Sequence, residues 1–508
     1  MLGVAKIWTG SDRQSRALTK PPLHVLSGRQ TATVLLSSLS PRSSSNMLPT
    51  IAELVAHFLR SNGYTETLAV FISEAELPVD TGSRNPDFTI EQILQEKKTF
   101  DTSLNFERLG LEDNGRKWRS IAPSRPIDVE SSPRSNILSV SPINLALPSQ
   151  PLVQTYLAAT TADRRLHLID PSSSSYRVVQ SYSTFQDSPI LDLTVLYSRY
   201  LLAASMSGKL LLFDTKTEQI LDQRKDHSKY VVKIATWSME SGTIVASAGW
   251  DAKVFLYRMS TDSADLRLGD PVATISLSTV PETLLFIRSP ETSRPILLLT
   301  RKDSTFVYYY AIKAEGGDES AISLIGKQNL SPHSNAWVAF SPSDLQVNPI
   351  DPSVVAVATS STPHMKLLVV KLLLPPEVEQ ASDRSESAPS QPVTQASQAR
   401  ADRLLQAREE AAILVNVSTM APQTAYSTPR LVWRPDGSGI YVSSDDGIVR
   451  GFEAATGRLT ASLSAHEPGS KIRCLCAGQA IFGNENKQNE EFLLTGGFDQ
   501  KLVLWRTG

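Results

Sequence analysis

The side chains best suited to chemistry are few in this chain of 508 residues, which carries seven histidines and two cysteines. Cys474 and Cys476 are separated by one residue, so on a strand both thiols would point to the same face. Two ligands without a second pair make a poor zinc site. We therefore interpret them as buried thiols of a strand, and we expect neither a metal nor a cofactor.

Motifs typical of catalysis are absent from the sequence. It has no glycine-rich phosphate loop ending in Lys-Ser or Lys-Thr and no Gly-x-Ser-x-Gly elbow. The formal net charge of −2 argues against nucleic acid as a partner, and no apolar run reaches the ~18 residues of a membrane span. The two cysteines favour a reducing compartment, the cytoplasm or the nucleus. We predict a binding protein rather than an enzyme, with no small-molecule substrate.

The elements that must position these side chains are most regular near the C-terminal end. The apolar runs Phe492–Leu494 and Leu502–Trp505 flank Gly496-Gly497 and Asp499-Gln500. Two apolar runs joined by a tight Gly/Asp turn predict a β-hairpin. One hairpin cannot cover its own faces, so further repeats are expected upstream.

This hairpin resembles the end of a WD repeat, which is one blade of a β-propeller. The resemblance implies a structural tetrad of an aspartate, a histidine, a serine or threonine and a tryptophan. The aspartate accepts a hydrogen bond from the imidazole, and the hydroxyl bridges the imidazole and the indole N–H. Such a buried polar chain is tolerable only when every member has its partner. The residues at the tetrad positions of this hairpin are His466, Thr495, Asp499 and Trp505. A second set, with Tyr where Trp is usual, is His227, Ser247, Asp251 and Tyr257.

Similar hairpins recur from about residue 137 onward, and the fifth is degraded around His333. Seven units over ~370 residues predict a mainly β fold, a seven-bladed β-propeller over residues 137–508. The chain stops at the third strand of its last blade. A strand from about 126–145 must therefore complete that blade and remove its open edge, with Ile137–Ser141 as the best candidate.

Residues 375–410 interrupt the repeats with a run rich in Ser, Gln, Ala and Glu. We expect a disordered insertion there, with a helix near Gln398–Ala411. The repeats should then resume with a strand over Ala412–Val417.

The N-terminal part has a different character. Residues 1–46 are rich in Ser, Arg and Thr, and we expect a disordered extension there. A transit peptide and a natural start at Met47 remain alternatives. Thr50 with Glu53 makes a capping box for a helix that Asn62-Gly63 would end, and a second helix is expected over about 65–76.

Residues 47–80 resemble a LisH motif, a small helical dimerisation module. Two helices of this size bury too little surface to be stable alone, so self-association would cover their apolar stripe. Packing against the chain's own propeller is the alternative. The resemblance implies a homodimer through Ile51, Leu54, Val55, Phe58, Leu59, Tyr64, Leu68 and Phe71.

A further helix is expected over Thr89–Phe100, where Thr89 and Gln92 can form a cap. By resemblance it makes residues 81–111 a helical extension of the dimerisation module; docking on the side of the propeller is the alternative. Residues 112–136 carry prolines and polar side chains, and we interpret them as a linker.

Membership of a LisH and WD-repeat family implies a scaffold in a multiprotein complex of the ubiquitin-ligase, corepressor or motor-regulating type. A propeller enzyme and a phosphate- or lipid-binding propeller are the alternatives.

By resemblance to WD-repeat propellers, the residues just before the turn aspartates lie at the mouth of the ring. Large side chains on loops of a rigid scaffold are typical binding residues. The expected partner-binding residues are Trp250, Phe498, Met206, Arg164 and Arg165.

Overall fold

The structure is a computed structural model of the whole chain, and it falls into two compact units, Met1–Thr99 and Phe100–Gly508. The residues that it describes are 50–83, 89–92, 94–95, 118–129, 134–173, 176–183, 186–260, 266–312, 322–332, 340–375, 395–482 and 489–507. In these ranges, no helix combines the length and the apolar character needed to cross a membrane. The expected extension over residues 1–46 and the start of the degraded fifth repeat, around His333, lie outside them.

The N-terminal unit contains a helical hairpin of α1 (Ile51–Ser61) and α2 (Thr65–Glu74). The capping box is present, because the Thr50 hydroxyl accepts from the backbone N–H of Glu53 while the Glu53 carboxylate accepts from that of Thr50. Gly63 adopts a left-handed conformation, with φ at 77°, and turns the chain into α2. The side chains of Ala56 and Leu68 are buried.

The chain that follows α2 folds back over α1. The Arg60 guanidinium donates to the carbonyls of Val79 and Thr81, at 3.1 and 3.2 Å. A Cβ on Gly82 would clash with the backbone of His57, so only glycine fits this close approach. The cap expected between Thr89 and Gln92 is also present, while the full extent of its helix lies outside the described residues.

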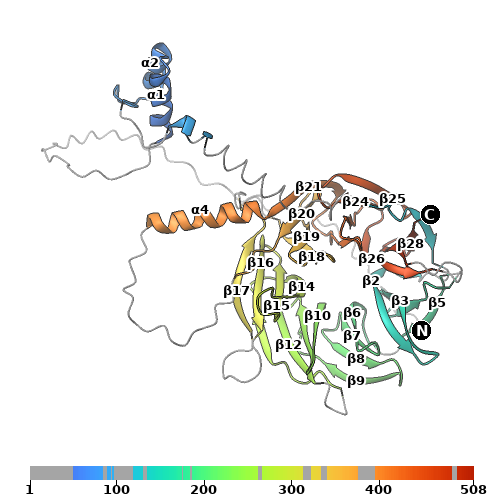
Figure 1. Cartoon of the computed structure of the whole chain (residues 1–508). Helices are drawn as coiled ribbons and strands as arrows, with labels where there is room; N and C mark the ends of the chain where they lie inside the picture. The colour runs from blue at the N-terminus through green and yellow to red at the C-terminus, as the bar shows by residue number, and fades with distance from the viewer. Residues whose placement is uncertain are drawn as a thin grey trace, which may run out of the picture. The chain divides into compact units, whose positions relative to one another are not determined.

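The second unit is a ring of seven four-stranded antiparallel sheets, shown in Figure 1. Blades one to three are built from β2 (Ile137–Leu147), β3 (Gln150–Thr161), β4 (Leu166–Ile169) and β5 (Val178–Tyr182); β6 (Ile190–Leu196), β7 (Tyr200–Ser205), β8 (Leu210–Asp214) and β9 (Gln219–Arg224); and β10 (Val231–Met239), β11 (Gly242–Gly249), β12 (Lys253–Ser260) and β13 (Ala273–Ser276).

Blades four to six follow the same order along the chain. They are built from β14 (Pro281–Arg288), β15 (Pro295–Arg301), β16 (Phe306–Ile312) and β17 (Ile322–Asn329); β18 (Pro342–Val347), β19 (Val354–Thr359), β20 (His364–Lys371) and β21 (Ile413–Pro422); and β22 (Leu431–Trp433), β23 (Gly439–Val442), β24 (Ile448–Glu453) and β25 (Leu459–Ser464). Blade seven contains β26 (Ile472–Ile481), β27 (Asn489–Gly497) and β28 (Leu502–Arg506).

The first strand of each blade lines the centre of the ring. First strands of neighbouring blades contact one another all the way round, including β26 with β2. Second strands such as β11 and β19 are buried along their whole length, because side chains on both of their faces pack against a neighbouring blade. Outer strands such as β25 are mostly exposed, and Leu463 is the one buried residue of β25. The apolar core therefore lies between the blades.

Blade seven is completed by a strand from far upstream, but not by the candidate named from the sequence. β1 (Arg125–Asp128) pairs with β28, with Pro126 opposite Trp505. Ile137 instead opens β2, the innermost strand of blade one, because its 11 residues carry the apolar side chains that a central strand needs. The expected linker over residues 112–136 was therefore wrong for the part that holds β1.

The insertion between the third and fourth strands of blade five is partly helical. The helix expected near Gln398–Ala411 is α4 (Gln395–Ala411). Near its C-terminal end, the Glu409 carboxylate accepts the backbone N–H of Asn329 at 2.7 Å. The expected strand resumes as β21, while residues 376–394 lie outside the described part of the chain.

Candidate interaction face

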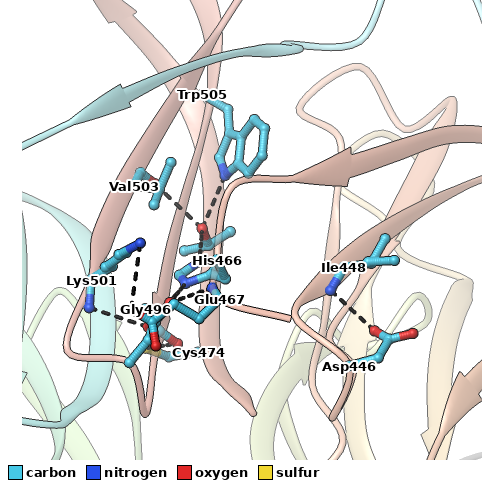
Figure 2. Close-up of polar contacts among 11 residues, drawn as sticks. Asp446, Ile448, His466, Glu467, Cys474, Gly496, Lys501, Val503 and Trp505 are labelled. Atoms are coloured by element: carbon cyan, nitrogen blue, oxygen red, sulfur yellow. Dashed lines mark hydrogen bonds and ion pairs between the residues drawn. The ribbon is translucent and has the colours of Figure 1, made fainter. Parts of the chain in front are cut away.

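Blade seven holds a continuous polar chain of four side chains, drawn in Figure 2. The Trp505 indole N–H donates to the Thr495 hydroxyl at 2.9 Å, and that hydroxyl lies 2.8 Å from Nε2 of His466. Nδ1 of His466 lies 2.9 Å from the Asp499 carboxylate. A single proton arrangement satisfies every member: the hydroxyl donates to Nε2, and the Nδ1–H donates to the aspartate.

The same aspartate also orders the turn that carries it. Asp499 accepts the backbone N–H groups of Glu467 and Lys501, at 3.0 and 3.2 Å. Burial lowers the pKa of His466 below its ordinary 6.5, and Asp499 offsets only part of that effect. The ring is therefore neutral at pH 7, which makes this histidine a structural group that fixes the turn between β27 and β28.

Blade three repeats the chain with one difference. His227 places Nδ1 2.9 Å from Asp251 and Nε2 2.9 Å from the Ser247 hydroxyl. Tyr257 occupies the strand position of the tryptophan, but its hydroxyl donates to Asp226 at 3.0 Å. Asp226 also accepts two hydrogen bonds from Arg224. The longer reach of the phenol thus links this tetrad to the strand β9 before it.

The turns that these tetrads fix all lie at one end of the ring, which we call the turn face. Most blades share one backbone hydrogen bond there, from the turn between the second and third strands to the segment that leads into the first strand. These bonds join Ala162 to Asn136, Met206 to Pro189, Trp250 to Tyr230, Lys302 to Val280, Ser360 to Ser341 and Phe498 to Lys471. The turn face is therefore a set of equivalent positions held rigidly by the blades.

Trp250 projects from the turn face on blade three. Its side chain is 49 % exposed, and its ring stacks against that of Tyr230 with centroids 5.1 Å apart. Tyr230 is itself 39 % exposed and was not among the residues expected from the sequence. Its position beside the first strand of the blade, opposite the turn, is the signal that could have identified it. Together the two rings form a solvent-facing aromatic surface on a fixed backbone.

Phe498 takes the equivalent position on blade seven and is 41 % exposed. The Arg473 guanidinium lies over its ring, with Cζ 4.9 Å from the centroid. Met206, at the same position on blade two, is half-buried. The three side chains expected on equivalent turns thus differ in how much surface they offer.

The two arginines expected on blade one are both exposed. Arg164 has φ at 69° and donates to the backbone carbonyl of Asp187 on the next blade, at 3.5 Å. Nε of Arg165 lies 3.3 Å from Asp163 in an exposed ion pair. Such exposed pairs contribute little to stability.

The residues expected to make a dimer lie on the helical hairpin. Ile51 and Tyr64 are exposed, Leu68 is buried, and Leu54, Val55, Phe58, Leu59 and Phe71 are half-buried. Val70, which the sequence pattern did not single out, is 58 % exposed. Because only Ala56 and Leu68 of the described hairpin residues are buried, its apolar side chains remain largely accessible.

One buried cluster was missed entirely by sequence reasoning. Arg434 is fully buried, donates two hydrogen bonds to Glu491, and also donates to the backbone and the hydroxyl of Ser120. Its guanidinium lies 4.3 Å from the centre of the Trp118 ring. The backbone N–H of Trp118 donates to Glu453. The cluster fixes the segment before β1 to blades six and seven, which explains how so short a strand closes the ring.

The two cysteines are buried in β26, and burial raises the pKa of both thiols. They lie in the apolar cluster between blades seven and one. Across the described part of the chain, no group of three His, Cys, Asp or Glu side chains is placed to hold a metal ion.

Two family models match the chain. The model described as UCP007778, beta-propeller domain, matches residues 146–506, which is more than half of the chain. The model described as UCP007778, LisH domain, matches residues 50–79, which include both helices of the hairpin. A search of curated proteins gives no significant match.

Proposed function

Because the chain belongs to the UCP007778 family, we propose that it is a protein-interaction scaffold that pairs through its LisH helices and binds partner proteins on the turn face of its propeller. The observation that carries this proposal is the exposed aromatic surface of Trp250 and Tyr230 on a rigid turn. Tryptophan and tyrosine on a fixed backbone contribute much of the energy in protein interfaces, since little side-chain entropy is lost when they are covered.

Pairing of two copies is the second part of the proposal. Its support is the apolar surface that the hairpin leaves open at Ile51, Tyr64 and Val70. A hairpin of 11 and 10 residues buries little surface by itself, so a second copy would supply the missing contacts. Two linked propellers would then bind a bivalent partner more tightly than one propeller does, because the second contact forms within the same complex.

The partner proteins are proposed to belong to complexes of the ubiquitin-ligase, corepressor or motor-regulating type, in the cytoplasm or the nucleus. No catalytic role is proposed. The structural roles of His227 and His466 support this view, because both rings are engaged at both nitrogens and have pKa values lowered by burial.

Affinity capture tests the turn-face part of the proposal. The full chain should retain a reproducible set of proteins from cell extract, and Trp250→Ala should reduce their recovery by ~10-fold or more, since removal of a central interface tryptophan typically costs about 2 kcal/mol. The matched control is Leu152→Ala, because Leu152 is 76 % exposed on β3 near the opposite end of the ring. Equal recovery with Trp250→Ala and with the unaltered chain would contradict the proposal.

A further inference from the structure

Where the first strands begin, the residues skipped in the strand pairing are apolar in blades one to three and polar in blades four, five and seven. Most first strands shift register at their start, so that one residue is skipped in the pairing with the second strand. Because the shift recurs at the same place, the skipped residues form one set around the ring. They are Leu138, Leu191 and Val232 in blades one to three, and Glu282, Ser343 and Arg473 in blades four, five and seven.

Arg473 is the unusual member of this set. Its side chain is half-buried, and no hydrogen bond or ion pair joins that side chain to any of the described residues. Its guanidinium does lie over the ring of Phe498. Burial lowers its pKa, and the nearby positive charge of Arg430 lowers it further. A guanidinium nevertheless stays charged in proteins, and a partly buried charge without a partner is unfavourable. An anion bound beside Arg473 would therefore stabilise it.

Arg430 is the second cation of this site. It directly precedes β22 on blade six, where its backbone N–H donates to the Ser443 hydroxyl at 2.9 Å. Its side chain is 31 % exposed and lies 3.5 Å from the Asp344 carboxylate. That carboxylate also accepts the backbone N–H of Leu431, so its charge is shared between two donors.

The nearby acidic groups form no ion pair with Arg473 within the described part of the chain. Asp445 pairs with Lys471 at 2.9 Å and accepts from the Ser427 hydroxyl. Burial raises the pKa of Glu282, with Arg430 offsetting only part of that effect, and no ion pair between them is formed. Arg430 is thus paired with Asp344 of blade five and Lys471 with Asp445 of blade six, while Arg473 has no ion-pair partner among the described residues.

We infer that the turn face of blades six and seven binds an acidic segment of a partner protein, with one anionic side chain, a carboxylate or a phosphate ester, between Arg430 and Arg473 and an apolar neighbour against Phe498. This inference rests on the proposed function, because it names the partner chemistry for the same face. The Phe498 ring, 41 % exposed beneath a guanidinium, suits a short apolar residue next to the anion. Arginine donors match the planar geometry of carboxylate and phosphate oxygens.

The probe for this inference is a library of short synthetic peptides whose central residue is fixed as glutamate, phosphoserine, glutamine or lysine. The purified full chain should select glutamate or phosphoserine over glutamine by about tenfold, with lysine weakest. The ratio of glutamate to phosphoserine distinguishes the two anions. Arg473→Gln and Arg430→Gln should each remove most of the preference, and Arg473→Lys should keep part of it, because it keeps the charge without the planar donors.

Arg288→Gln is the matched control, since Arg288 is exposed at the far end of β14 and its loss changes net charge equally. Thermal unfolding of each variant separates lost binding from lost folding, and Arg473→Lys provides the test should Arg473→Gln fail to fold. No preference for anions in the unaltered chain, or the same preference in Arg473→Gln, would overturn the inference. If proteins captured through Trp250 are retained in that case, the proposed scaffold function survives while its acidic partner does not.

Discussion

At the scale of single residues, the protein depends on buried polar chains in which every member has a hydrogen-bond partner. The tetrad of blade seven is joined without a gap from Trp505 to Asp499. By contrast, the Asp303 side chain at the turn of blade four is exposed, and no hydrogen bond joins it to the described residues. Equivalent turn positions therefore carry unequal energetic weight.

We predict that Asp499→Ala lowers the free energy of unfolding by about 3 kcal/mol, because it leaves the buried His466 donor and two backbone N–H groups without their acceptor. Asp303→Ala should cost only about 1 kcal/mol, which arises from placing alanine at a φ of 58° rather than from a lost bond. Chemical denaturation of both variants measures the difference. Equal destabilisation would show that the blade-seven tetrad has no special weight.

The two tetrad histidines also predict a pH dependence. Burial lowers the pKa of His227 and His466 below 6.5, so the unfolded chain binds protons more readily than the folded one. Their contribution to stability should be complete above pH 6.5 and fall as pH drops below it, by up to about 1.4 kcal/mol per pH unit for each ring. Denaturation across this range should give a shallower slope for His466→Gln, and an unchanged slope would argue against a neutral buried ring.

Residue types and spacing were enough to place the tetrads, since each aspartate follows its hydroxyl at a fixed distance within one hairpin. They could not reveal that Tyr257 bonds to Asp226, because that depends on how far a phenol reaches across the blade. The Arg434 cluster was equally hidden. Its partners Ser120 and Glu491 lie 314 and 57 residues away, and no local pattern marks such a pair.

At the scale of elements, the closing strand shows where pattern reasoning fails. An outer strand contributes few inward side chains, and only one residue of Arg125–Asp128 is half-buried while the other three are exposed. Ile137–Leu147 has a much stronger apolar pattern, and for that reason its first residues were predicted to be the closing strand. The need for a closing strand followed from counting strands, but its identity followed from packing around Trp118 and Arg434 that only the fold provides.

A deletion series tests the closure. A chain that begins at residue 116 keeps Trp118 and β1, and it should match the full propeller in stability. A chain that begins at residue 131 loses the apolar contacts of Ala122, Ile127 and Val129 and exposes the edge of β28, so its free energy of unfolding should fall by about 3 kcal/mol or more. Equal melting temperatures would contradict closure by β1.

At the scale of the whole molecule, the sequence predicted both units because each has a strong local signature, the capped amphipathic hairpin and the repeated blades. How the two units work together depends on assembly, which no local pattern encodes. We propose that the hairpin pairs two copies while each propeller presents its turn face to partners. The proposed assembly therefore contains two copies of the chain, and this stoichiometry is the central claim.

Sedimentation equilibrium of the full chain and of a chain lacking residues 1–80 tests that claim most directly. The full chain should have twice the mass of one copy, and the shortened chain the mass of one. Ile51→Glu should also give single copies without unfolding the hairpin, since Ile51 is 82 % exposed, whereas Val79→Glu, equally exposed but outside the predicted interface, should not. The same stoichiometry for the full and the shortened chain would contradict pairing through the LisH helices.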